Sequence, residues 1–234
     1  MRELTITDAI LQARADAAAP LITFYDDASG ERTELSSTTT ANWAAKVASF
    51  LRDEVGVMPG DTVAVSLPAH WQTFVVLLGS WWAGADVALG PAPAASVAFC
   101  GRDEIHHLDA DEVVAVPLDP FALPVSGLPS GVVDFGSSVR VHADTFSPVV
   151  AGPSALDGRT TAEVLTAARE FAATAGITGD SRVLSSRHWD GADDVVANVL
   201  ATVAVGASLV QVAHPDPSAM TSRSTTERVT LSLS

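Results

Sequence analysis

The fold is decided by residues 56–89, which read GVMPGDTVAVSLPAHWQTFVVLLGSWWAGADVAL, together with a second stretch that repeats their pattern. Residues 176–212 read GITGDSRVLSSRHWDGADDVVANVLATVAVGASLVQV. Each stretch has, in the same order, a Gly-Asp pair, a short apolar run, a His-Trp pair, an apolar run of helix length, a Gly-Ala pair and a second short apolar run. The chain is therefore expected to contain one supersecondary unit twice.

Each copy predicts a strand, a helix and a second strand that lies parallel to the first. Parallel neighbours require a crossover connection, and the helix supplies it. The short runs are apolar at nearly every position, which is typical of strands in a sheet that helices cover on both faces. The sequence therefore predicts an α/β fold with two related parallel sheets and covering helices.

Further strands are predicted outside the repeated units. Residues 21–25 and 32–35 are two extended runs that flank a polar, glycine-containing loop, and this pattern indicates a hairpin near the amino terminus. Residues 113–116 and 132–135 are two more strand candidates, and both lie between the copies.

The boundary between the halves is placed where prolines interrupt the pattern. Pro148 and Pro153 lie in a segment, residues 145–157, that separates the two copies. The chain is thus expected to divide into a first α/β subdomain with the N-terminal hairpin, residues 1–150, and a second subdomain, residues 151–234, that repeats the βαβ unit.

Charge and composition exclude several classes of partner. The 234 residues include 13 basic and 28 acidic side chains, a formal net charge of −15, which repels nucleic acid and an anionic membrane surface. Residues 195–213 carry no charge, but Asn198, Gln211 and a Gly206-Ala207 break argue against a membrane span. A single cysteine allows no internal disulfide, and a cytoplasmic location is expected.

The two His-Trp pairs are the candidate ligand-binding residues. In parallel α/β sheets, ligands gather at the carboxyl ends of the strands, where the loops diverge. His70 and Trp71 follow the first strand of one copy, and His188 and Trp189 follow the first strand of the other. The alternative is that the tryptophans pack against the sheets and that the histidines are solvated.

Residues 56–89 resemble the amino-terminal part of the adenylate-forming superfamily, which includes acyl-CoA synthetases, peptide-synthetase adenylation domains and luciferases. In that family, a PGD-x-VAV strand precedes a helix and an AGA turn, and residues 176–212 resemble a later GD-x-VLS segment. The resemblance implies the fold of the N-terminal half of an adenylate-forming enzyme's large domain. It also implies that His188 and Trp189 lie on a loop that lines the nucleotide and acyl pocket. The chain is similar, too, to a group of short actinobacterial homologues of about this length.

The phosphate-binding loop of that family has no counterpart in this chain. Members of the family make acyl adenylates from ATP and a carboxylate, and a TSGTTG-x-PKG loop holds the phosphates. At the corresponding place, residues 149–161 read VVAGPSALDGRTT, with no lysine and with an acid, Asp157. Phosphate requires positive charge and open backbone amides. The lone lysine, Lys46, lies in an early predicted helix, and Thr226-Glu227 echoes the family's acid motif without the preceding Tyr-Gly. No cofactor is therefore predicted, although the resemblance makes ATP or AMP the candidates to test.

Other chemistries lack their motifs. The acids and histidines of residues 103–112 form neither the helical histidine pair of a zinc site nor a glycine-bearing calcium loop, so no metal site is predicted. No Gly-x-Ser-x-Gly and no Gly-x-Gly-x-x-Gly occurs, which argues against a serine hydrolase and a dinucleotide-binding enzyme. Cys100 is expected to be a buried structural residue. No catalytic residue is assigned.

Three functional hypotheses follow. The first is a truncated acyl-CoA synthetase-like homologue that lacks the phosphate loop and acts as a non-catalytic small-molecule or regulatory binding protein. The second is an interaction subunit, either a homodimer or a partner of another chain, because a half-domain would leave apolar surface uncovered. The third is a weak residual acid-CoA or AMP ligase. The first is preferred, and the chain is not expected to be an active adenylate-forming ligase by itself.

Overall fold

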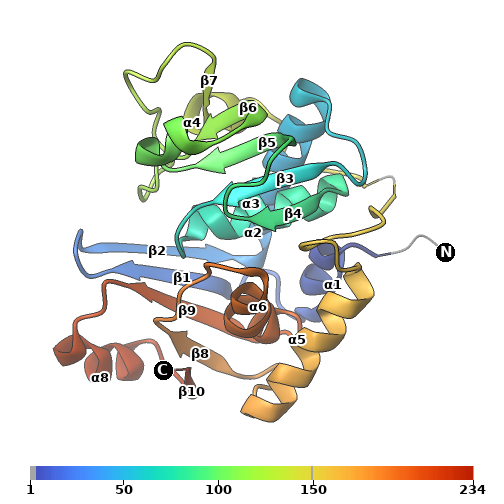
Figure 1. The fold of residues 1–234 in the computed structure, drawn as a ribbon. Coiled ribbons are helices and arrows are strands. Elements are labelled where there is room, and N and C mark those ends of the chain that lie inside the picture. Colours follow the sequence, from blue (N-terminus) through green and yellow to red (C-terminus); the bar gives the residue numbers. More distant parts are fainter. Residues whose placement is uncertain (1–3, 149, 234) are drawn as a thin grey trace.

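Two five-stranded sheets form the framework of the chain in a computed structural model, which describes residues 4–148 and 150–233 (Figure 1). The strands are β1 Pro20–Asp26, β2 Glu31–Ser36, β3 Thr62–Ser66, β4 Asp86–Leu89, β5 Ala95–Cys100, β6 Ala110–Ala115, β7 Val132–Asp134, β8 Arg182–Ser185, β9 Ser208–Ala213 and β10 Leu231–Leu233. The helices are α1 Ile6–Ala13, α2 Ser37–Ser49, α3 Trp71–Ala83, α4 Phe135–Ser138, α5 Thr161–Ala175, α6 Ala192–Val195, α7 Ala201–Val203 and α8 Pro217–Thr226. Two π-helical turns, Phe50–Val55 and Val196–Leu200, extend α2 and join α6 to α7, and 3₁₀ turns lie at Arg102–His107 and Val139–Val141.

The first repeat lies in a fully parallel sheet with the strand order β4-β3-β5-β6-β7. β3 and β4 pair directly, with Val63 opposite Val87, and α3 connects them. β5 lies on the other side of β3, with Val97 opposite Val63. β6 and β7 correspond to the two strand candidates between the copies. β5 was not expected, because a run with three small residues in six, ASVAFC, carries only a weak strand signal.

The second repeat lies in a mixed sheet with the strand order β10-β8-β9-β1-β2. β8 and β9 are parallel neighbours, with Val183 opposite Leu209. β1 pairs in parallel with the other edge of β9 and antiparallel with β2. Both repeated units are therefore βαβ modules, as the sequence predicted, and each lies in a sheet of its own.

The N-terminal hairpin belongs to this second sheet, whereas the sequence analysis placed it with the first subdomain. Phe24 of β1 pairs with Gln211 of β9, and Leu21, Ile22 and Phe24 are each at most 2% exposed. Without β1, the apolar strand β9 would be an uncovered edge of its sheet. The sheet thus joins residues 20–36 to residues 182–233, so the division of the chain between the two sheets is not at residue 150.

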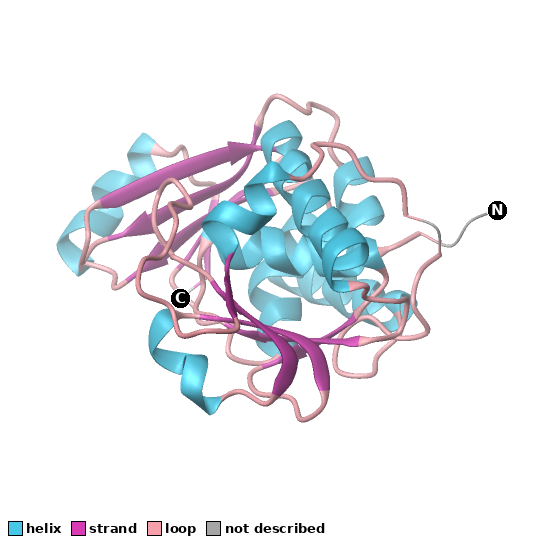
Figure 2. Cartoon of the chain, turned by 90° about the horizontal axis from the view of Figure 1, so that it is seen from above, coloured by secondary structure: helices cyan, strands magenta, loops and turns pink. Residues whose placement is uncertain are grey.

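Helices pack between the two sheets, as Figure 2 shows. α3 contacts β1 of one sheet and β3 of the other, and every residue of α3 except Trp82 is buried. Gly79 lies where α2 crosses α3, and a Cβ added there would be only 2.4 Å from Val47 Cβ. Close approach of the two helices therefore requires glycine at this position. One hydrophobic core runs through both sheets.

The uncharged run of residues 195–213 is divided between helical structure and strand β9. Gly206 ends the helical part with a φ of +89°, a conformation that glycine adopts readily. In the part of the chain that the structure describes, no helix combines the length and the apolar character needed to cross a bilayer.

Candidate functional site

The first His-Trp pair is part of the protein interior. His70 caps the amino terminus of α3, where its Nδ1 accepts a hydrogen bond of 3.1 Å from the backbone N–H of Gln72. Its Nε2 lies 3.6 Å from Glu31 Oε2, and both residues are less than 9% exposed. Burial alone would raise the pKa of Glu31, but the nearby His70 ring and a hydrogen bond from the Thr33 hydroxyl hold it below its ordinary value. Trp71 is 2% exposed.

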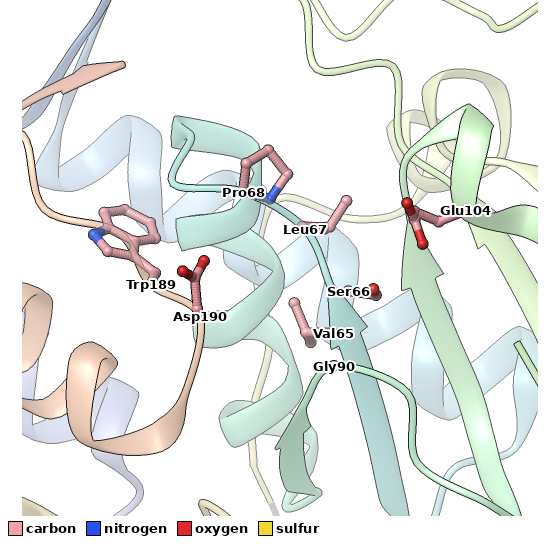
Figure 3. Close-up of a pocket in the computed structure, with 8 residues that line it drawn as sticks. All are labelled: Val65, Ser66, Leu67, Pro68, Gly90, Glu104, Trp189 and Asp190. Atoms are coloured by element: carbon pink, nitrogen blue, oxygen red, sulfur yellow. The ribbon is translucent and has the colours of Figure 1, made fainter. Parts of the chain in front are cut away.

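The second His-Trp pair is divided between two pockets. Trp189 is 1% exposed and forms part of the wall of one pocket, which has a volume of about 290 Å³ (Figure 3). We call it the Trp189 pocket; it is lined by Val65, Ser66, Leu67, Pro68, Gly90, Glu104, Trp189 and Asp190. His188 is exposed and lines a second pocket of about 250 Å³. We call it the Gln211 pocket; it is lined by Pro68, Ala69, Ser186, Arg187, His188, Gln211, Val212, Ala213, His214 and Pro215.

Both pockets lie at the carboxyl ends of parallel strands, and Pro68 lines both of them. The Gln211 pocket is formed by the loops that follow β3, β8 and β9. The loops singled out by the repeated His-Trp motif therefore do border pockets. His70 and Trp71 do not line either one.

Gln211 is the residue of this region that sequence reasoning did not assign to a site. It is 1% exposed, and its Nε2 donates a 3.0 Å hydrogen bond to the backbone carbonyl of Arg187. Its Oε1 is buried and accepts no hydrogen bond from any described residue. A buried acceptor without a donor costs about 1–3 kcal/mol, so this oxygen favours any ligand that donates to it. The available signal was a polar residue between apolar neighbours, Val210 and Val212, within the strand.

An arginine and two histidines are among the residues that line the Gln211 pocket. Arg187 and His188 lie on the loop after β8, and His214 follows β9. His214 Nδ1 lies 2.7 Å from Asp26 Oδ1, which fixes the imidazole at the rim. Burial opposes ionisation of Asp26, but hydrogen bonds led by the one from His214 hold its pKa below the ordinary value.

Residues 155–159 form a closed turn against β4, within the segment that the sequence resemblance aligns with the phosphate loop. The N–H of Asp157 donates to Val87 O at 2.9 Å, and the N–H of Val87 donates to Ala155 O at 3.0 Å. The N–H of Ala155 donates to Arg159 O at 2.7 Å, and that of Gly158 donates to the Asp86 carboxylate at 3.1 Å. These backbone amides are therefore already bonded within the protein.

The charge of this turn is also unsuited to phosphate. Burial raises the pKa of Asp157, and the nearby Asp86 carboxylate raises it further. Arg159, the cation of the turn, forms an ion pair of 2.9 Å with Asp193. Lys46 lies elsewhere: its Nζ donates to His142 O at 2.7 Å and forms a 2.7 Å ion pair with Asp144.

Glu227, between α8 and β10, is a structural residue that binds the second sheet. Its carboxylate accepts hydrogen bonds from Tyr25 Oη at 2.6 Å, from Arg32 at 2.9 Å and from Arg182. Burial alone would raise the pKa of Glu227, but these hydrogen bonds lower it to about 2. The carboxylate thus ties the segment between α8 and β10 to β1, β2 and β8.

The possible metal ligands and the single cysteine can also be located in the structure. Among the described residues, no three His, Cys, Asp or Glu side chains lie close enough together to hold a metal ion. Cys100 is buried, and burial is the main cause that raises the pKa of its thiol to about 11. A thiol with so high a pKa is a poor nucleophile at neutral pH.

Comparison with known proteins identifies relatives of two kinds. A TIGR03089 family protein of Mycobacterium tuberculosis (strain ATCC 25618 / H37Rv) is 47% identical over 236 residues, which cover 97% of this chain and 97% of that protein. No family model matches the chain. An acyl-CoA synthetase of Brucella canis has a similar structure with a TM-score of 0.78 at 17% identity, over 97% of this chain and 47% of that enzyme.

A benzoate CoA ligase of Burkholderia xenovorans LB400 has a TM-score of 0.73 at 17% identity, over 98% of this chain and 50% of that enzyme. The chain therefore spans about half the length of these solved enzymes. The similarity confirms the fold predicted from the resemblance, that of the N-terminal half of an adenylate-forming enzyme's large domain.

Proposed function

Because the chain belongs to the TIGR03089 family and has an acyl-CoA synthetase fold over about half the length of such an enzyme, we propose that it binds a small molecule without making acyl adenylates by itself. The observation that carries this proposal is the closed turn of residues 155–159. The chain has the strands and the loops of the acyl-CoA synthetase fold. In the turn, however, the backbone amides are already hydrogen-bonded and the carboxylates of Asp86 and Asp157 lie close by, whereas a triphosphate needs open amides and cations.

The Gln211 pocket is the proposed ligand site. A ligand with a hydroxyl or amine group can donate to Gln211 Oε1, which is buried and accepts no hydrogen bond from the described residues. Arg187, His188 and His214 favour an anionic group at the other end of the ligand. At about 250 Å³ the pocket is smaller than the usual range for drug-sized ligands, about 300–1,000 Å³, so a small metabolite fits it better than a nucleotide does.

Titration calorimetry with ATP, AMP, acyl adenylates and a panel of small hydroxy acids tests the proposal. We expect saturable heat with a hydroxy acid and none with ATP. Gln211→Met removes the acceptor at nearly constant volume, so it should abolish the heat while the circular dichroism spectrum stays unchanged. His188→Ala should weaken binding, and His107→Ala is its control, because His107 is an exposed histidine on the 3₁₀ turn after β5 and does not line the pocket. Binding that is equally strong in Gln211→Met would refute this site.

Residual ligase activity is tested separately. The proposal predicts no ATP–pyrophosphate exchange with any carboxylate of a broad panel, because the exchange requires a bound triphosphate. Exchange above the background of a heat-denatured sample would establish the ligase alternative instead.

An interaction subunit is the second candidate, and one surface feature favours it. Phe121, Leu123 and Val141 are 68%, 50% and 80% exposed. Arg140 donates a hydrogen bond to Phe121 O, which holds the two loops that carry these residues together. Light scattering at micromolar concentration tests self-association through this patch: a dimer that Phe121→Asp dissociates would support it, and a monomer would count against it.

A further inference from the structure

The His70 ring is held in one tautomer between the end of a helix and a buried carboxylate. Its Nδ1 accepts the 3.1 Å hydrogen bond from the backbone N–H of Gln72, so this nitrogen carries no proton. The neutral ring therefore carries its proton on Nε2, which lies 3.6 Å from Glu31 Oε2 and has no hydrogen-bond partner among the described residues. The side chains of His70 and Glu31 are 5% and 4% exposed, so both contacts are shielded from solvent.

Three elements pack around this ring, and one ionisable group on them faces it. β2 contributes Glu31, whose carboxylate also accepts a 2.7 Å hydrogen bond from the Thr33 hydroxyl. β1 contributes Phe24, whose ring centroid lies 4.4 Å from that of His70. α3 contributes Trp71, with centroids 5.8 Å apart, and contains no charged residue. The other charged residues of β1 and β2 form ion pairs elsewhere: Asp26 with His214, and Arg32 with Glu34 and Glu227.

The loop that leads into His70 forms one wall of the Gln211 pocket. Pro68 and Ala69 line that pocket and immediately precede His70. The first turn of α3 holds this loop in place, because the hydroxyl of Thr73 donates a 2.7 Å hydrogen bond to Pro68 O. The helix end that His70 caps therefore also positions the wall of the pocket.

A protonated His70 cannot keep this arrangement. An imidazolium donates at both nitrogens, so its Nδ1–H would face the N–H of Gln72, and the cap on α3 would be lost. The charge of a histidine changes between about pH 5 and 8, and a buried carboxylate such as Glu31 stabilises the positive form. We propose that His70 is a pH-sensitive positioning residue of the Gln211 pocket, which fixes the pocket wall when neutral and releases it when protonated. This His70 switch would regulate the ligand site proposed above, and its role rests on that proposed function.

Heteronuclear NMR of the free protein between pH 8 and pH 5 tests the His70 switch without a ligand. At pH 8, the ring nitrogen shifts should show the tautomer with the proton on Nε2. As His70 becomes protonated, the backbone amide signals of Gln72 and Ala69 should move with the same midpoint as the ring. The protection factor of the Gln72 amide should fall roughly fivefold, as expected when a helix cap is lost. A ring that stays neutral at pH 5 in the folded protein, or amide signals that do not follow the ring, would overturn the proposal.

Variants of His70 separate the switch from a merely structural role. His70→Asn keeps a capping side chain that does not titrate, so the Gln72 and Ala69 signals should lose this pH response. His70→Ala removes the cap at every pH, so its Ala69 signal at pH 8 should already be displaced toward the acid form of the wild type. If His70→Ala does not fold, the comparison of wild type with His70→Asn decides the matter.

His107→Asn is the matched control for these variants. His107 is an exposed histidine on the Arg102–His107 turn, and its replacement should leave the response of the Gln72 and Ala69 signals intact. An equal pH response of these signals in His70→Asn and in the wild type would refute the switch.

The switch and the proposed function can fail separately. A pH response that His70→Asn abolishes, together with no heat from any hydroxy acid, would confirm the switch and refute the ligand site. Saturable heat with a hydroxy acid, together with no response of the Gln72 amide, would do the reverse.

Discussion

Replacement of Glu227 by glutamine removes a buried charge that binds β1, β2 and β8 of the second sheet, while it preserves the shape of the side chain. The Glu227 side chain is only 5% exposed and lies between Arg32 and Arg182, which keeps its pKa at about 2, compared with an ordinary value of 4.5. Each pKa unit corresponds to about 1.4 kcal/mol. The variant should therefore lose about 3 kcal/mol of unfolding free energy at pH 7.

The pH dependence of this loss gives a sharper test than its size. The pKa of Glu227 is lower in the folded than in the unfolded state, so its ionisation stabilises the fold fully above about pH 5. The stabilisation is lost as the pH falls from 4.5 through 2. The difference between wild type and variant should thus shrink from about 3 kcal/mol at pH 7 to about 2 kcal/mol at pH 3.5.

Urea unfolding followed by tryptophan fluorescence measures both values. At pH 7 the urea midpoint of Glu227→Gln should be lower by roughly 1 M or more. Glu170→Gln is the control, because Glu170 is an exposed residue of α5, and its effect should stay within about 0.5 kcal/mol. A midpoint equal to that of the wild type at pH 7, or a loss that does not change with pH, would refute the assignment of Glu227 as an ionised structural residue.

Three further substitutions test the packing and the closed turn. Gly79→Ala should lower stability by about 1–3 kcal/mol because the new methyl group would overlap Val47, and a thermal midpoint above that of the wild type would contradict this close contact. Asp157→Asn should raise the urea midpoint at pH 7, because burial and Asp86 disfavour the ionised carboxylate, and should have no such effect at pH 3, where the carboxyl is protonated. Equal midpoints of variant and wild type at pH 7 would contradict this role of the Asp157 charge. Lys46→Met should cost about 1–3 kcal/mol through lost hydrogen bonds to backbone carbonyls, and an unchanged midpoint would show that these bonds contribute nothing.

The repeated βαβ modules could be predicted because they are encoded locally. Each depends on the order of apolar runs, glycines and turns within fewer than forty residues, and β3-α3-β4 follows that order. The sheet that the hairpin joins could not be predicted in the same way. The pairing of Phe24 with Gln211 connects residues far apart in the sequence, and the pattern of β1 alone fits either sheet.

The candidate site shows the same limit. His70 and His188 have the same sequence context, but His70 is a buried helix cap and His188 an exposed residue at a pocket, because the segments packed around them differ. Gln211 carried no motif at all. Only the structure makes it a candidate ligand-binding residue, because its amide nitrogen donates to the Arg187 carbonyl while its oxygen accepts no hydrogen bond from a described group. By contrast, the mismatch of Asp157 with phosphate was visible in the sequence, and the structure adds the hydrogen bonds that close the turn.

Titration of the chain with magnesium-ATP is the most direct test of the closed turn, with calorimetry and backbone amide NMR recorded on the same sample. Because the amides of residues 155–159 are bonded to β4 and to one another, we predict no saturable heat up to millimolar ATP and no shift of the Gly158 amide signal. A saturable one-to-one isotherm accompanied by shifts of the Asp157 and Gly158 amides would contradict the account.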